Sequence, residues 1–175
     1  MKKPSVSELT DLLNKPKLMH WANQLGLEGK SLNDVRRNNT KDGTNKHSGI
    51  CNYINKGIKL SDANIQVKLE SFLSTLEIVG LEETFTNDLF CGRVDVLFKK
   101  DSILYIGDFK RNYRKPYLEH YIQLVCYKMH FGAEKICIID TNEFIIHEIL
   151  LYDKENLYIE LINHLVKIYH LKQIL

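Results

Sequence analysis

The first third of the chain spaces its apolar residues as amphipathic helices do. Ser7 is placed to cap a first helix, and Pro16 is placed to open a second helix that ends at Gly26. Two further helices are predicted over residues 44–56 and 63–75, where apolar side chains again recur every three or four positions. The N-terminal part of the chain is therefore predicted to be helical.

Residues 29–46 interrupt this pattern, because they are polar, rich in Asn and Lys, and without an apolar period. We predict a long mobile loop here, since loops of this length in compact domains are usually functional or disordered. The helix predicted after it carries His47 on its apolar stripe, together with Ile50 and Ile54. A histidine in that position is either a satisfied core residue or a ligand, and the spacing leaves both interpretations open.

The chain then changes to the two-residue alternation of strands. Strands are predicted over residues 77–80, around Phe85 and over 88–99. The last of these is followed by a strand over 103–110, and the polar run 99–102 between the two is typical of a β-hairpin turn.

The second half of the chain adds a helix, a second hairpin and a last helix. Pro116 opens a predicted helix that ends near Gly132, and residues 135–140 and 144–150 form the hairpin strands. The last helix, over residues 154–172, has a predicted apolar stripe of Leu157, Leu161, Leu165 and Ile168. This order predicts an α/β (α+β) fold with a central mixed β-sheet flanked by helices.

Composition is typical of a globular protein, and the overall charge does not indicate a binding partner. The 175 residues suffice for one domain, and 24 Lys and Arg against 22 Asp and Glu give a formal net charge of +2. The four cysteines are widely spaced and are predicted to be free thiols in a reducing compartment. The N-terminus lacks the apolar run of a signal peptide and no stretch is long enough to span a bilayer, so we expect a cytoplasmic protein without a membrane partner.

The first predicted hairpin carries the residues most informative about chemistry. Asp95 interrupts an apolar strand, and Asp108 and Lys110 project together from the partner strand because they are two residues apart. A turn centred between residues 100 and 101 would place Asp95 opposite Ile106, with Asp108 as its diagonal neighbour on the same face, roughly 7–8 Å away. Two carboxylates at that separation can share a divalent cation, and the Phe109 carbonyl is available as a further oxygen. The alternative is a pair of polar residues on a solvated sheet face.

The helix after this hairpin adds a second group of polar residues. Gln123 and Tyr127 are four positions apart and share one helical face, with His120 and His130 close to that face. Alone, this spacing is more typical of an interfacial tyrosine beside a satisfied amide.

Taken in order, these residues resemble the PD-(D/E)XK nuclease superfamily, above all its RecB-like branch, which includes phage-type exonucleases and the mitochondrial genome maintenance exonuclease. The G-x-x-x-H helix of that branch is matched by Gly43–His47, its G-x-x-D strand by Gly92–Asp95, its D/E-x-K strand by Asp108–Lys110 and its Q-x-x-x-Y helix by Gln123–Tyr127. The match covers about residues 40–130. It implies a restriction-endonuclease-like core in one domain.

Three parts of that single domain, spanning residues 1–175, follow from the resemblance. Residues 1–42 form a helical N-terminal portion with a basic loop, residues 43–150 form the catalytic core and residues 151–175 form the C-terminal helix.

The resemblance also implies a metal site and a set of catalytic residues. The metal ligands are His47, Asp95, Asp108 and the Phe109 backbone carbonyl, around Mg²⁺ or Mn²⁺. An acidic residue upstream of the G-x-x-D strand often contributes, and Glu82 and Glu83 are both candidates. The catalytic residues implied are Asp95, Asp108, Lys110, Gln123 and Tyr127; Lys110 orients the attacking water, while Gln123 and Tyr127 support the lysine and the substrate strand. The cysteines lack the clustering of the iron–sulfur members of the branch, so no iron–sulfur cluster is expected.

Local charge on both sides of the expected site favours a phosphate-bearing substrate. The candidate nucleic-acid-binding residues are Arg36, Arg37, Arg93, Arg111, Arg114, Lys115 and Tyr117, with Lys41 and Lys46 on the predicted loop before His47. Each charged run taken alone is also compatible with a solvated loop.

The leading hypothesis is a metal-dependent deoxyribonuclease, an exonuclease acting on DNA ends or single strands in replication, recombination or repair. The chain has no P-loop, so it is expected either to act on DNA as a stand-alone nuclease or to work beside a separate helicase or recombination protein. A structure-selective endonuclease resembling a junction resolvase, and a catalytically silent nucleic-acid-binding module, remain open. The small size and the Lys-, Asn- and Ile-rich composition suggest a phage or mobile-element origin.

Overall fold

The structure is a computed structural model that describes residues 2–13, 15–111 and 113–174. The chain divides into two compact units, one formed by Met1–Leu12 with Ser61–Leu175 and the other by Leu13–Leu60. Asn112, in the basic segment after the first predicted hairpin, lies outside the described residues.

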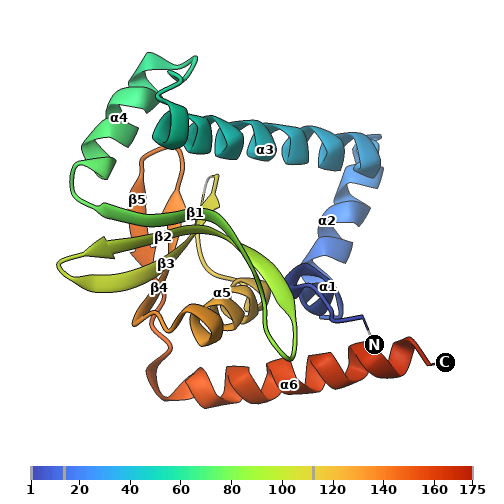
Figure 1. The fold of residues 1–175 in the computed structure, drawn as a ribbon. Coiled ribbons are helices and arrows are strands. Elements are labelled where there is room, and N and C mark those ends of the chain that lie inside the picture. Colours follow the sequence, from blue (N-terminus) through green and yellow to red (C-terminus); the bar gives the residue numbers. More distant parts are fainter. Residues whose placement is uncertain (1, 14, 112, 175) are drawn as a thin grey trace. The chain divides into compact units, whose positions relative to one another are not determined.

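The larger unit is built on a five-stranded mixed sheet whose strands follow one another in chain order (Figure 1). The strands are β1 (Glu77–Thr86), β2 (Cys91–Lys100), β3 (Ile103–Lys110), β4 (Lys135–Asp140) and β5 (Ile145–Glu148). All neighbouring pairs are antiparallel except β3 and β4, which are parallel. The predicted mixed sheet flanked by helices is confirmed.

Five helical segments belong to this unit: α1 (Val6–Asp11), α4 (Ala63–Leu73), α5 (Leu118–Phe131), the 3₁₀ turn η1 (Tyr152–Lys154) and α6 (Glu155–Lys172). Helix α5 is the crossover that a parallel β3–β4 pair requires, and it ends as predicted at Gly132, whose φ of 66° is the left-handed C-cap geometry. Within the described part of the chain, no helix combines the length and apolar character needed to cross a membrane.

Two details of the predicted helices were wrong. Helix α1 is capped by Ser5 instead of Ser7, because Ser5 and Glu8 form a reciprocal capping box with bonds of 3.1 and 2.7 Å. Helix α6 leaves Leu157 and Ile168 exposed and buries a neighbouring face instead. The residues buried on that face are Ile162, Leu165, Val166 and Tyr169. Apolar residues occur on two sides of α6. The side that packs against α1 and α5 is the one that carries Tyr169.

The hairpin of β2 and β3 turns through two residues, Asp101 and Ser102, whose φ values of 52° and 65° are both positive. Two successive positive φ values are the signature of a type I′ turn, which matches the twist of antiparallel strands. As a result Leu97 pairs with Ile106, so the prediction that Asp95 lies opposite Ile106 was wrong by two residues. An even shift leaves each side chain on its predicted face of the sheet.

The smaller unit contains α2 (Pro16–Leu27) and α3 (Leu32–Lys56). Helix α2 has the predicted bounds within one residue, but the loop predicted over residues 29–46 was wrong, because α3 continues through most of it. Ser31 caps α3 by accepting a bond from the Asp34 N–H at 3.3 Å, and Gly57, with φ 66°, ends it. The helix is polar over most of its length, so its caps mark it better than any apolar period.

The core of the larger unit lies along the central strands, where Phe98, Ile106, Ile136 and Ile138 are almost fully buried. All four cysteines are free thiols, as predicted. The hairpin that carries the candidate chemistry is thus anchored in the best-packed part of the sheet.

Candidate active site

The β2–β3 hairpin places two aspartates side by side. Val96 pairs with Gly107, so the next position along the ladder sets Asp95 opposite Asp108. Asp95 Oδ2 also accepts a hydrogen bond of 3.0 Å from the Phe109 N–H, which ties β2 to β3 beyond the last ladder pair. Asp108 is only 2% exposed, which is unusual for a carboxylate and requires compensating partners.

Lys110 supplies the main compensation for the buried charge of Asp108. Its Nζ lies 2.7 Å from Asp108 Oδ2, and both side chains leave the same face of β3. Burial acts to lower the pKa of Lys110, but the charges of Asp108, Asp95 and Glu119 outweigh it and raise the pKa above its ordinary value. Lys110 is therefore a cation at neutral pH, beside two carboxylates.

Helix α5 contributes Gln123 and Tyr127 to the same group. Gln123 Nε2 donates to Asp108 Oδ1 at 3.1 Å and lies 3.2 Å from the Tyr127 hydroxyl, which accepts its second hydrogen. Burial, more than any other influence, raises the pKa of the Tyr127 phenol, so this hydroxyl stays protonated. Gln123 thus connects the carboxylate of β3 to the tyrosine one helical turn further along α5.

A cleft of about 540 Å³ opens at this group. Asp95, Gln123 and Tyr127 line it, together with Arg93 from β2 and the N-terminal end of α1 at Ser5–Ser7. Three of the candidate catalytic residues therefore line a space large enough for part of a nucleotide strand, and Asp108 and Lys110 contact them or each other beside it.

Glycine at the first position of the G-x-x-D motif has a steric reason. A Cβ on Gly92 would lie 2.9 Å from Cε1 of Phe85, closer than real Cβ contacts, and 3.0 Å from Cε1 of Tyr127, tighter than most of them. The rings of Phe85 and Tyr127 meet edge to face with centroids 5.8 Å apart. The absence of a side chain at position 92 leaves room for both rings.

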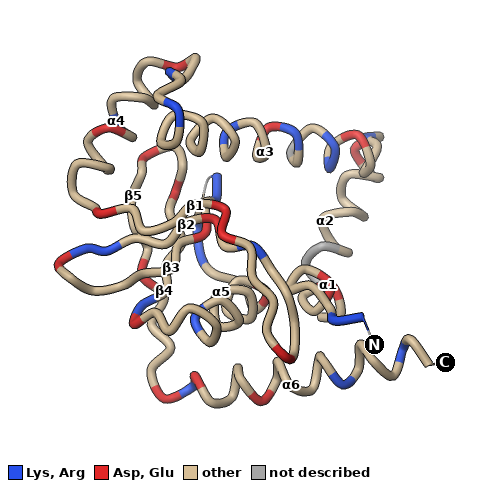
Figure 2. Tube along the Cα trace, viewed as in Figure 1, with Lys and Arg blue, Asp and Glu red and all other residues tan. Residues whose placement is uncertain are grey.

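The two acidic candidates on β1 differ in position. Leu81 pairs with Val96 and Glu83 with Val94, so the intervening Glu82 lies across from Asp95. Glu82 has a positive φ of 51°, and its carboxylate lies 3.4 Å from Arg93. Acidic residues thus gather where β1 and β2 run side by side (Figure 2).

Glu83 points elsewhere. Its side chain is exposed and lies over Gly80, whose added Cβ would meet Glu83 Cγ at 2.6 Å. Glu82 is therefore the better placed of the two to join Asp95.

The segment after Lys110 carries the remaining candidates of the larger unit. Arg111, Arg114 and Lys115 are exposed, as is Tyr117, which precedes α5. The Tyr117 N–H donates to Nδ1 of His120 at 3.1 Å. Burial and the nearby positive charge of Lys110 lower the pKa of His120 to about 4, so its imidazole is neutral at pH 7 with the hydrogen on Nε2.

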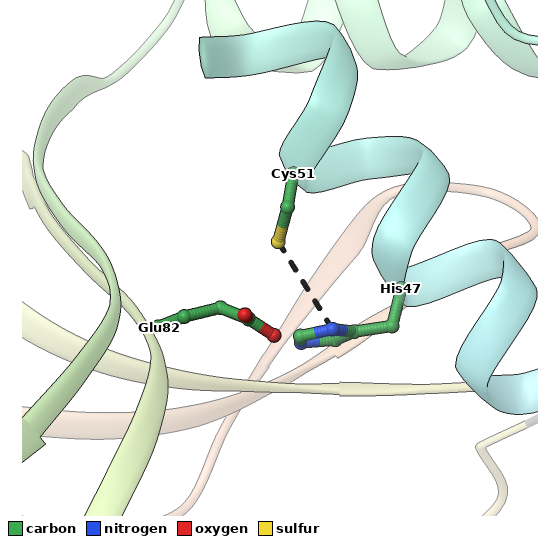
Figure 3. A group of neighbouring side chains, drawn as sticks. All are labelled: His47, Cys51 and Glu82. Atoms are coloured by element: carbon green, nitrogen blue, oxygen red, sulfur yellow. Dashed lines mark hydrogen bonds between the residues drawn. The ribbon is translucent and has the colours of Figure 1, made fainter.

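The other candidates belong to the smaller unit. His47 lies on α3 one turn before Cys51, with Nδ1 and Sγ 4.0 Å apart (Figure 3). The cations predicted on a loop are instead on α3, where lysines and arginines recur along the helix (Figure 2). These residues are Arg36, Arg37, Lys41 and Lys46.

Two features of the larger unit were missed in the sequence. Asp140, at the end of β4, is buried and accepts backbone hydrogen bonds from three residues. An aspartate that ends an apolar strand and precedes Thr-Asn is a signal that could have identified it. His120 was noted only for its place on the helix, and its contact with the Tyr117 backbone has no sequence signature.

The donor types are those that a hard divalent cation prefers. Asp95 and Asp108 carry carboxylates on adjacent strands, Glu82 lies across from Asp95 on β1, and oxygen donors of this kind suit Mg²⁺ and Mn²⁺. When bound there, such an ion would polarise a phosphate and lower the pKa of a water molecule. Tyr127 lines the cleft, and its hydroxyl can donate a hydrogen bond to an anionic oxygen there.

Comparison with known proteins adds little to this description. No family model matches the chain, and no curated protein matches it. Among the solved structures to which the chain is similar is the crystal structure of SSO0001, at 15% sequence identity and a TM-score of 0.46, over 95% of this chain and 76% of that chain. A likeness of this extent identifies neither a family nor a function.

Proposed function

We propose that the protein is a metal-dependent nuclease that hydrolyses phosphodiester bonds of DNA, as an exonuclease on ends or single strands. The observation that carries the proposal is the network in which Lys110 and Gln123 both contact the buried carboxylate of Asp108, beside Asp95 and a cleft. A purely structural ion pair has no need for a second carboxylate and a protonated tyrosine facing the same space.

The residues divide the work of hydrolysis among them. Asp95 and Asp108, with Glu82 and the Phe109 carbonyl, would hold Mg²⁺ or Mn²⁺. Lys110 would orient the attacking water and offset negative charge that develops on the phosphate. Tyr127 would donate from its protonated hydroxyl to the substrate strand, and Gln123 would keep both Asp108 and Tyr127 in place. The role of His47 as a further metal ligand stays a prediction from the resemblance.

Charge around the cleft supports a nucleic-acid substrate. Arg93 lines the cleft, and Arg111, Arg114 and Lys115 follow Lys110 within five positions, with Tyr117 as a stacking surface. The cations of α3 are further candidates for phosphate contacts. A replication, recombination or repair role beside a helicase is the setting we propose for this activity.

A cleavage assay tests the proposal. End-labelled single-stranded and duplex DNA and a closed circle would be incubated with Mg²⁺, Mn²⁺ or EDTA, using the wild type, Lys110→Ala and Lys100→Ala. Lys100 lies at the other end of the same hairpin and is the matched control. Metal-dependent loss of linear DNA, at least about a hundredfold slower in Lys110→Ala and unchanged in Lys100→Ala, is the expected result.

Other outcomes of this assay would change the proposal. Cleavage of the circle would replace the exonuclease with an endonuclease at the same site. DNA binding without cleavage under any metal condition would contradict the enzyme and leave a binding module.

A further inference from the structure

Asp140, the last residue of β4, connects two loops beside the candidate site. It is 8% exposed and pairs with Lys110 in the parallel β3–β4 ladder. Its Oδ2 accepts the N–H of Tyr113 at 2.9 Å, and its Oδ1 accepts those of Asn142 at 2.8 Å and Glu143 at 3.3 Å. A carboxylate that accepts three backbone N–H groups can remain buried without a cation, because those bonds replace its hydration.

Tyr113 is held from a second side as well. Its ring lies 4.7 Å from the ring of His147 on β5, measured between centroids. The Thr141 N–H donates to the Lys110 carbonyl at 2.9 Å, so the turn after β4 is also bonded to the end of β3. The chain that leaves the catalytic strand is therefore fixed at Tyr113, one residue before Arg114.

We propose that Asp140 is a positioning residue that holds the segment 113–117 so that Arg114 and Lys115 meet phosphates of the bound strand. This inference rests on the proposed function, because it requires a nucleic-acid substrate at the neighbouring cleft. Cations held in place before binding cost less ordering entropy when the strand arrives. Each phosphate contact that they make adds to the salt dependence of binding.

The test measures binding of a single-stranded oligonucleotide in EDTA over a range of salt concentrations. Asp140→Asn keeps the shape of the side chain but cannot accept on both atoms. It is expected to raise Kd about tenfold and to make the slope of log Kd against log salt shallower by about one. Asp62→Asn is the matched control, because Asp62 also accepts two backbone N–H groups, at the start of α4. This control should keep the wild-type affinity and slope.

A double-mutant cycle separates positioning from general destabilisation. If Asp140 acts through the two cations, Arg114→Ala with Lys115→Ala should weaken binding strongly in the wild type and by less than about twofold in Asp140→Asn. Equal losses in both backgrounds would overturn the proposal, as would wild-type binding by Asp140→Asn.

Hydrogen exchange on the wild type gives a readout that needs no variant. The Tyr113 amide should be as protected as that of Asn142. Exchange of the Tyr113 amide at the rate of an unfolded chain would contradict its hydrogen bond to Asp140 and overturn the proposal. Failure of the wild type to bind any oligonucleotide would instead overturn the proposed function itself, which distinguishes the two.

Discussion

Gln123 on α5 donates from Nε2 to Asp108 Oδ1 at 3.1 Å. The other oxygen of the same carboxylate lies 2.7 Å from Lys110 Nζ, and the same amide nitrogen lies 3.2 Å from the Tyr127 hydroxyl. One side-chain amide therefore links a buried carboxylate to a tyrosine at the cleft. A substitution at one residue of this network is expected to disturb the contacts of the others. The free-energy effects of substitutions within it should therefore not be additive.

Asp108→Asn should weaken binding of Mn²⁺ by at least about tenfold. The substitution keeps an acceptor for Gln123 but removes the negative charge that a divalent cation requires. Calorimetric titration with Mn²⁺ measures the effect directly. Asp101→Asn is the control, because Asp101 lies at the hairpin turn with positive φ, a conformation that asparagine tolerates. Equal affinity of Asp108→Asn and the wild type would remove Asp108 from the metal site.

Gly92→Ala should slow cleavage more than about tenfold while leaving Mn²⁺ affinity close to that of the wild type. The added methyl group would lie about 3 Å from the rings of Phe85 and Tyr127, so these rings must shift, and we expect the Tyr127 hydroxyl to be displaced from Gln123. We expect the free energy of unfolding to fall by about 1–3 kcal/mol, the usual range for overpacking. Initial rates measure the effect on cleavage, and denaturant melts measure the effect on the free energy of unfolding.

The control for this substitution is Gly26→Ala on α2, where an added Cβ meets nothing within 4 Å. It should leave the rate unchanged and stabilise the helix by up to about 1 kcal/mol. A normal rate in Gly92→Ala would show that the position of Tyr127 does not matter for cleavage.

The sequence was sufficient to predict that Asp95 and Asp108 share a face, although not their register. The turn at Asp101–Ser102 is a type I′ turn formed without glycine, so its two-residue length is hard to recognise. The predicted pairing was wrong by two residues, and an even shift leaves each side chain on its predicted face of the sheet.

Other parts depend on contacts that no local pattern encodes. The choice between Glu82 and Glu83 follows from the β1–β2 register and from the turn of the Glu83 side chain over Gly80. The second half of α3 was predicted, but its first half was missed because that half lacks an apolar period, although Ser31 with Asp34 three residues later was a readable N-cap signal. Asp140 forms bonds across 27 residues to Tyr113, which only the folded chain brings together.

His120 predicts a loss of stability in mild acid. Burial, followed by the charge of Lys110, lowers its pKa from 6.5 to about 4. Between pH 6.5 and 4, His120 is protonated in the unfolded chain but stays neutral in the folded protein. The free energy of unfolding therefore falls as the pH drops from 6.5 to 4. The expected loss is about 1–3 kcal/mol. Urea melts of the wild type and His120→Gln at pH 7, 5.5 and 4.5 measure it, with the variant losing less.

Glu8 also contributes stability that is lost in acid, but over a lower pH range than the contribution of His120. Its bonds to the Ser5 backbone and hydroxyl partners lower its pKa from 4.5 to about 2, so its contribution is lost only below pH 4.5. Glu8→Gln should therefore match the wild-type slope between pH 7 and 5, while His120→Gln flattens it. Identical slopes for His120→Gln and the wild type in that interval would show that His120 takes up its proton in the folded state as readily as in the unfolded chain. The lowered pKa of the His120 imidazole would then be wrong.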